Sequence, residues 1–286
     1  MRANIRIGDI DLLFIYQYND YFGNELDKYS INDLSPNHHT LEVVVNETIV
    51  PIDGNDKFIY KNRVKIKKDE MNYIVTSNPD GSVKHLISYD DKYNHIKIVL
   101  NKKLDKRLAE YEYVLSGMMF FEIALTNSYL AIHASAMSIN DKAVLLSGPS
   151  GSGKSTQTEY FKEVFIENQI INEDKPLVYE KENKLYVCGS PWSGKNVLNQ
   201  NLKVELTHIL FVNKAEETKL VDLTHKEKIK QLMRNIHRPG YEENINHMVY
   251  LVERIIESVQ IYRFNCVNNK SSSEYLKKYM EATYEN

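Results

Sequence analysis

The residues best suited to chemistry form one segment, Gly148-Pro149-Ser150-Gly151-Ser152-Gly153-Lys154-Ser155. It matches the phosphate-loop (Walker A) pattern G-x-x-x-x-G-K-[ST], and it follows an apolar run and opens a helical pattern, as the chemistry requires. In such a loop backbone amides converge on polyphosphate oxygens, the lysine reaches the β and γ phosphates, and the serine hydroxyl can ligate Mg²⁺. We predict a nucleotide site from Gly148 to Thr156, with ATP and Mg²⁺ as cofactors. A chance match in a Gly/Ser turn is the alternative.

The position of one histidine relative to this loop can be predicted from the sequence. The segment Ile139-Asn140-Asp141-Lys142 indicates a hairpin turn between two strands. If Asn140 and Asp141 form a two-residue loop, Ile139 faces Lys142, and counting back along both strands sets His133 opposite Gly148. An imidazole there could touch a terminal phosphate, although a histidine in an apolar strand is commonly a core residue.

Two carboxylates follow the loop by one helix and one strand. The strand Gln169 to Asn172 ends in Glu173-Asp174, and the carboxyl end of a strand beside a phosphate loop is where a kinase needs acidic groups. One carboxylate could bind the metal while the other accepts a proton. A solvated acidic turn is the alternative.

A second glycine-bracketed loop, Gly189 to Lys195, contains the only tryptophan, Trp192. Lys195 could close over phosphates, or the loop could be an ordinary Pro/Gly turn with a packed indole, and spacing leaves the two open. For the later cations Arg234, Arg238 and Arg254, solvated helix charge is the favoured interpretation.

These residues need an α/β framework. Up to about Leu100, short strand-like runs alternate with turn clusters, which predicts an antiparallel β-rich region over residues 1–103. A helix is expected over Leu104 to Leu125, and strands then alternate with helices through residues 104–286, which is the pattern of an α/β domain. The phosphate loop makes this the predicted nucleotide-binding domain. We also expect a strand from Leu130 to Met137, and capping boxes at Thr224 with Glu227 and at Ser271 with Glu274.

Composition excludes several classes of protein. The 286 residues carry 36 basic and 39 acidic side chains, so the net charge of −3 does not suggest a nucleic-acid or membrane surface. Two separated cysteines indicate neither a disulfide framework nor a zinc site. With no signal peptide at the N-terminus, we expect a cytoplasmic protein, whose oligomeric state, a homo-oligomer included, stays open.

Four segments in this order resemble the HPr kinase/phosphorylase superfamily and its relatives: His133-Ala134-Ser135-Ala136, the phosphate loop, Asn172-Glu173-Asp174 and the loop from Gly189 to Lys195. The resemblance covers about Leu115 to Phe264 and implies the nucleotide fold shared with phosphoenolpyruvate carboxykinases, a partly antiparallel core in which a hairpin feeds the phosphate loop. It further implies that His133 lies near the transferred phosphate, and that Lys154 and Ser155 serve nucleotide and magnesium.

The chain departs from the family at two places. Glu173 stands where the family usually has the first of two aspartates, and Trp192 and Lys195 are typical of the relatives rather than of the enzymes that act on HPr. Some similar relatives phosphorylate a serine in the precursor of a ribosomally made peptide. Residues 1–110 resemble no family.

Three hypotheses follow. The first is a Mg-ATP kinase acting on a hydroxyl, such as a serine of a peptide or protein, with catalytic residues His133, Lys154, Glu173 and Asp174, metal ligands Ser155 and Asp174, and Lys195 on the nucleotide. The second is a nucleotide-binding regulatory module that has lost turnover. The third is a carboxykinase-like enzyme using a small carboxylic acid, which the few arginines near the motifs disfavour.

Overall fold

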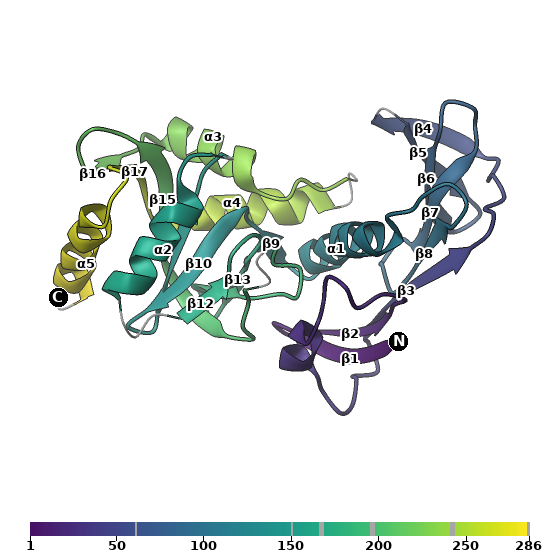
Figure 1. Ribbon diagram of the computed structural model, residues 1–286, viewed down its shortest axis with the longest axis horizontal. Helices are drawn as coiled ribbons and strands as arrows, with labels where there is room; N and C mark the ends of the chain where they lie inside the picture. The colour runs from purple at the N-terminus through teal and green to yellow at the C-terminus, as the bar shows by residue number, and fades with distance from the viewer. Residues whose placement is uncertain (61, 150, 166–168, 195–197, 241–243, 285–286) are drawn as a thin grey trace. The chain divides into compact units, whose positions relative to one another are not determined.

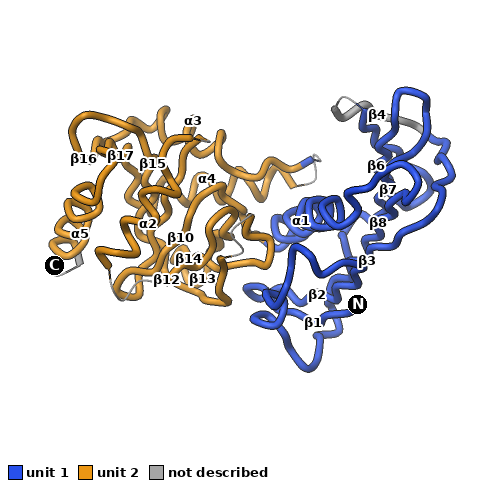
Figure 2. Tube along the Cα trace, in the orientation of Figure 1, with its two compact units in different colours: residues 1–127, 240–242 blue, residues 128–239, 243–286 orange. Residues whose placement is uncertain are grey.

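The computed structural model of the chain describes all residues except 61, 150, 166–168, 195–197, 241–243 and 285–286. The chain divides into two compact units (Figure 2). Unit 1 comprises residues 1–127 and 240–242, and unit 2 comprises residues 128–239 and 243–286. The boundary predicted from the sequence lies between residues 103 and 104, before the first α-helix, whereas the units divide after that helix.

Unit 1 is built on one mixed sheet with the strand order β1-β2-β3-β8-β7-β6-β5-β4 (Figure 1). Its strands are β1 (Arg2–Ile7), β2 (Ile10–Ile15), β3 (His39–Asn46), β4 (Asn55–Tyr60), β5 (Arg63–Lys68), β6 (Met71–Ser77), β7 (Val83–Asp90) and β8 (His95–Asn101). Neighbours pair antiparallel except for β2 with β3 and β3 with β8, which are parallel. The expectation of a purely antiparallel region is wrong at these pairs. A long connection containing the 3-10 helix η1 (Glu25–Tyr29) gives the chain room to return in the same direction from β2 to β3.

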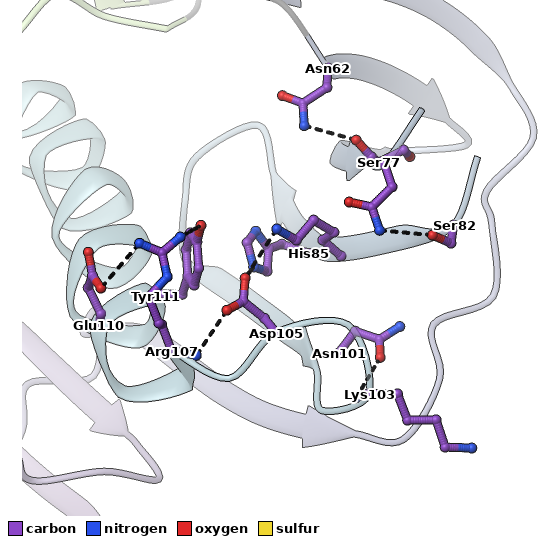
Figure 3. A network of polar contacts seen from close by, with 12 residues as sticks. Asn62, Ser77, Ser82, His85, Asn101, Lys103, Asp105, Arg107, Glu110 and Tyr111 are labelled. Carbon is purple, nitrogen blue, oxygen red and sulfur yellow. Dashed lines mark hydrogen bonds and ion pairs between the residues drawn. The ribbon is translucent and has the colours of Figure 1, made fainter. Parts of the chain in front are cut away.

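Helix α1 (Leu108–Thr126) packs against β3 and β8 in unit 1. It begins at Leu108 rather than Leu104, because the Asp105 carboxylate holds a turn ahead of it by accepting a hydrogen bond of 2.9 Å from the Arg107 amide. Figure 3 shows the network at this end of the helix, where the His85 ring on β7 packs 4.3 Å from the Tyr111 ring and Arg107 Nη2 donates to the Tyr111 hydroxyl. Burial lowers the pKa of His85 to about 4, so a neutral imidazole joins the helix to the sheet.

Unit 2 contains a second mixed sheet, with the order β12-β10-β11-β15-β14-β13-β9 and with β17 and β16 continuing from β15. Its strands are β9 (Tyr129–Ala131), β10 (Ala134–Ile139), β11 (Lys142–Ser147), β12 (Gln169–Asn172), β13 (Leu177–Lys181), β14 (Lys184–Cys188), β15 (Lys203–Lys214), β16 (Lys219–Asp222) and β17 (Gln260–Cys266). β11, β15 and β17 run parallel, and the other pairs are antiparallel. The fold is therefore mixed α/β.

The hairpin of β10 and β11 has the predicted register. Ile139 pairs with Lys142 and Ala134 with Ser147, while Asn140 and Asp141 take φ values of 48° and 57°. Two left-handed residues in a two-residue loop make the turn whose twist matches antiparallel strands. The single strand predicted from Leu130 to Met137 is wrong, because β9 and β10 are separated at residues 132 and 133. There the His133 amide donates to the Asn235 carbonyl over 2.5 Å instead of joining the sheet.

Helices of unit 2 pack on the sheet. They are α2 (Lys154–Val164), α3 (His225–Asn235), α4 (Ile245–Ser258) and α5 (Ser271–Tyr284). α2 and α5 share a buried cluster with the strands, in which Phe161, Leu146 and Phe264 are fully enclosed, while α4 packs against β9 and β14. No helix among the described residues is long and apolar enough to cross a membrane.

One of the two predicted capping boxes is present. Thr224 and Glu227 exchange both hydrogen bonds at the start of α3. The box predicted at Ser271 and Glu274 is wrong, because Ser271 already lies in α5 and its hydroxyl donates to Asn269 Oδ1 over 2.6 Å. At the start of α5, the Asn269 side chain therefore accepts the hydrogen bond in place of Ser271.

Candidate active site

The loop from Gly148 to Gly153 joins β11 to α2, as the sequence predicts, and Lys154 is the first helical residue. Gly148 has a φ of 145°, and a Cβ atom placed there would lie 2.9 Å from Ser152 Oγ and 3.2 Å from the Val212 carbonyl oxygen. Both the backbone conformation and the close approach therefore require glycine. Within this loop, Ser150 lies outside the described residues.

The Lys154 ammonium is folded against its own loop. Nζ donates to the carbonyl oxygens of Gly148, over 2.5 Å, and Pro149, over 3.2 Å. Burial lowers the pKa of Lys154, and the negative charge of Asp174 opposes that effect. The ammonium thus lies at the loop, held by two of its carbonyl oxygens.

Strand directions bring the other predicted residues to the same end of the sheet. β10 is antiparallel to both β11 and β12, so the start of β10 lies beside the ends of the other two strands. The Ser147 hydroxyl donates to the His133 carbonyl over 2.8 Å, and the Ala134 amide donates to the Asp174 carbonyl over 3.0 Å. Hydrogen bonds to their backbone carbonyls therefore fix His133 and Asp174 next to the phosphate loop.

The His133 and Asp174 side chains form a close pair. His133 Nδ1 lies 3.2 Å from Asp174 Oδ1, and both side chains are partly exposed. Burial raises the pKa of the Asp174 carboxyl, but the hydrogen bond with His133 and the charges of Lys175 and Lys154 outweigh burial and hold the pKa below its ordinary value. At neutral pH this position carries a carboxylate.

Glu173 has a different partner. Its Oε1 lies 3.2 Å from Nζ of Lys162 on α2, and the Glu173 side chain is the more buried of the two. Burial lowers the pKa of Lys162, but its hydrogen bonds with Glu159 and Glu173 raise the pKa by more than burial lowers it. The net shift of the pKa is therefore upward. The two adjacent carboxylates therefore have different ion-pair partners, Lys162 for Glu173 and His133 for Asp174.

The loop after β14 closes on Asp174. Gly194 has a φ of 84°, and a Cβ atom there would lie 2.9 Å from Asp174 Cβ and 3.2 Å from Cγ. Trp192 in the same loop is 2% exposed, so the indole is packed inside the unit. Lys195, predicted to contact the nucleotide, lies outside the described residues.

Two buried asparagines, for which the sequence predicts no role, hold this loop. Asn172 Nδ2 donates to the Ser190 carbonyl over 3.1 Å, and Asn199 Nδ2 donates to Ser193 Oγ over 2.9 Å. The Asn172 Oδ1 atom also accepts from the Asp174 amide over 2.9 Å. A polar residue ending an apolar strand directly before two carboxylates was the available signal for Asn172.

A cavity of about 720 Å³ gathers these groups. Of the predicted residues, it is lined by His133, Gly151, Gly153, Lys154, Ser155, Thr156, Glu173 and Asp174. It is also lined by residues to which no role had been given, namely Ser135, Ser193, Gly194 and Lys214. The other predicted loop residues Gly148, Pro149 and Ser152 line a neighbouring cavity instead, together with Gly151. Lys214 ends β15, the parallel neighbour of β11, so its place at this edge follows from the sheet order.

The donor atoms are of the kind that suits Mg²⁺. No group of three or more His, Cys, Asp or Glu side chains with metal-binding geometry occurs among the described residues. The Ser155 hydroxyl and the Asp174 carboxylate nevertheless line one cavity. Mg²⁺ is commonly held by one or two protein oxygens together with substrate phosphates and water, so these two residues fit a metal that arrives with a nucleotide.

Comparison with known proteins adds little. No family model and no curated protein matches the chain. Among solved structures, the Hpr(Ser) kinase/phosphatase from Coxiella burnetii is similar over 55% of this chain and 99% of that chain, with 12% sequence identity and a TM-score of 0.31. A likeness at this level identifies no activity, so function has to be argued from the geometry of the site.

Proposed function

We propose that unit 2 is a Mg-ATP-dependent kinase that transfers a phosphoryl group to a hydroxyl, with serine of a peptide or protein as the acceptor. The observation that carries the proposal is the single cavity lined by the phosphate loop, Lys154 and the paired His133 and Asp174. Phosphoryl transfer depends mainly on positioning and on cationic groups around the moving phosphoryl, and it needs one acceptor for the hydroxyl proton. Each of these requirements has a residue in the cavity.

The roles follow from the contacts. Loop amides and Lys154 hold the β and γ phosphates, and His133 faces the transferred group. Asp174 takes the hydroxyl proton as the new P–O bond forms and the bond to the leaving phosphate oxygen breaks. Ser155 and the second oxygen of Asp174 are the protein ligands available to Mg²⁺, which when bound offsets the negative charge of the phosphates.

The nucleotide part is tested with Lys154→Ala. Loss of the ammonium should abolish Mg-ATP binding measured by calorimetry, while circular dichroism stays unchanged. Lys142→Ala is the matched control, because Lys142 pairs with Glu205 over 2.8 Å at the far end of β11 and lines neither cavity. Equal affinities in wild type and Lys154→Ala would contradict the phosphate-loop assignment.

Turnover is tested with two isosteric variants. Asp174→Asn should lower phosphoryl transfer at saturating Mg-ATP by about 10² to 10⁴, the usual contribution of a positioned proton acceptor. It should also weaken magnesium-dependent nucleotide binding, because it replaces a proposed metal ligand. Glu173→Gln should lower transfer much less, because its carboxylate is engaged by Lys162. Transfer is followed from labelled ATP into serine-containing peptides, including any encoded beside the gene. Undiminished transfer in both variants would remove the carboxylates from the mechanism.

A nucleotide-binding regulatory module is the second candidate. It is favoured by the ion pair of Glu173 with Lys162, which engages one of the two acidic side chains with a lysine. This candidate requires that the wild type binds Mg-ATP and transfers phosphate to no peptide, protein or carboxylic acid. Labelled transfer to any serine peptide decides for the kinase.

A further inference from the structure

A second cavity, of about 500 Å³, lies against the same phosphate loop. Its walls come from the loop, the carboxyl end of β15, helix α3 and strand β17. Three cations line it, Lys214, Arg234 and Arg263, and no carboxylate is among the described residues that line it. Neither His133 nor Asp174 reaches it. The two cavities thus differ in chemistry, and only the first can support phosphoryl transfer.

The two cavities meet at the loop. Gly151 and Lys214 line both of them. Lys214 Cε lies 3.7 Å from the position that a Cβ atom on Gly153 would occupy, so the lysine stem lies within contact distance of the last glycine of the loop. A ligand held on the loop amides can therefore extend into both cavities at once. Its reactive end belongs with His133 and Asp174, which leaves the second cavity for its other end.

The walls of the second cavity suit a nucleoside. Arg234 is exposed on α3 and has no hydrogen-bond or ion-pair partner among the described residues, so its planar guanidinium is available to stack on an aromatic base. Arg263 is different, because Nη2 is held 2.9 Å from Glu227 Oε1. Gln231 adds an amide with both donor and acceptor atoms, which can bond to the edge of a base.

We propose that the second cavity binds the base and ribose of the nucleotide, with Arg234 stacking on the base and Lys214 bridging to the phosphate nearest the ribose. This proposal rests on the proposed function, since it names where the rest of the phosphate donor lies. The cavity then determines that a nucleoside triphosphate, rather than an inorganic polyphosphate, is the preferred ligand.

The test compares two ligands, Mg-ATP and Mg-tripolyphosphate, by calorimetry on the full chain. Arg234→Leu should weaken ATP binding about tenfold, because a guanidinium stacked on an aromatic ring contributes about that much affinity. The same variant should change the affinity for tripolyphosphate less than twofold. Lys230→Leu is the matched control, because it removes the same charge from an exposed position of α3 that does not line the cavity. Gln231→Trp should fill the cavity and weaken ATP binding alone.

Every other pattern overturns the proposal. If Arg234→Leu weakens both ligands equally, the cavity holds phosphate rather than nucleoside. If it weakens neither, or if wild type binds the two ligands with equal affinity, the nucleoside lies elsewhere. These results differ from failure of the proposed function, in which wild type binds neither ligand or Lys154→Ala binds both as wild type does.

Discussion

Glu112 should make the stability of unit 1 depend on pH. Its side chain lies on α1, is 0% exposed, and accepts hydrogen bonds from the backbone amides of Gln17, over 2.8 Å, and Tyr18, over 3.2 Å. Burial raises the pKa of Glu112, the two amides lower it, and the net result is a pKa of about 7. A carboxylate has thus been buried against amides rather than against a lysine or arginine.

The size of the effect follows from this shift. With an ordinary pKa of 4.5 in the unfolded chain and about 7 in the folded chain, the folded state binds the proton more tightly. The stability from this proton is fully present below the unfolded pKa and is lost as the pH rises through the folded pKa. Between about pH 5 and about pH 8 the linkage relation gives a loss of about 2.5 kcal/mol in the free energy of unfolding.

Glu112→Gln removes the titration and keeps an acceptor oxygen for the amides. Its unfolding in urea should therefore lose about 2.5 kcal/mol less than wild type between about pH 5 and about pH 8. Circular dichroism reports both units, whereas the only tryptophan, Trp192, lies in unit 2, so its fluorescence provides an internal control. Glu110→Gln is the matched variant, because that side chain is 44% exposed on the same helix. An equal pH dependence in wild type and Glu112→Gln would refute the reasoning.

Three further outcomes are expected. Gly194→Ala should lower phosphoryl transfer at saturating Mg-ATP about 10²-fold, because its Cβ atom would lie 2.9 Å from Asp174 Cβ and displace the carboxylate; an unchanged rate would show that this placement does not matter. Thr224→Ala should cost unit 2 about 1 kcal/mol in urea unfolding followed by tryptophan fluorescence, since the capping box with Glu227 is lost, and an unaltered midpoint would argue against it. Burial raises the pKa of Cys266 to about 11, so iodoacetamide at about pH 8 should label this thiol only when urea unfolds the protein. Rapid labelling of Cys266 in the folded protein, detected by mass spectrometry, would contradict this expectation.

Local rules were enough to predict where His133 lies relative to the phosphate loop. A two-residue turn fixes the register of the strands on both sides of it, so Asn140 and Asp141 determined where His133 lies relative to the phosphate loop. The same reasoning failed in unit 1 for β2, β3 and β8, whose parallel pairing is set by a long connection and by strands distant in sequence. Strand direction across such connections leaves no local signal.

The roles of Glu173 and Asp174 could not be separated from their spacing. Both follow the same strand, and either could have been the proton acceptor. The distinction comes from neighbours on other elements: Lys162, from the middle of α2, reaches Glu173, while His133, at the start of β10, reaches Asp174. Helix packing over the sheet decides which carboxylate meets a lysine, and that packing depends on the whole core.

The loop with Trp192 combines a packed turn with a close approach to Asp174. A buried indole is what an ordinary packed turn predicts, and Trp192 is buried. Yet Gly194, two residues later, lies so close to Asp174 that a side chain there would collide with the carboxylate. The indole and the hydrogen bonds from Asn172 and Asn199 fix the loop in place, and that fixed loop limits where the Asp174 carboxylate can move. Packing in this loop therefore supports the role proposed for Asp174, because a proton acceptor is effective only when its position is maintained to within about 1 Å.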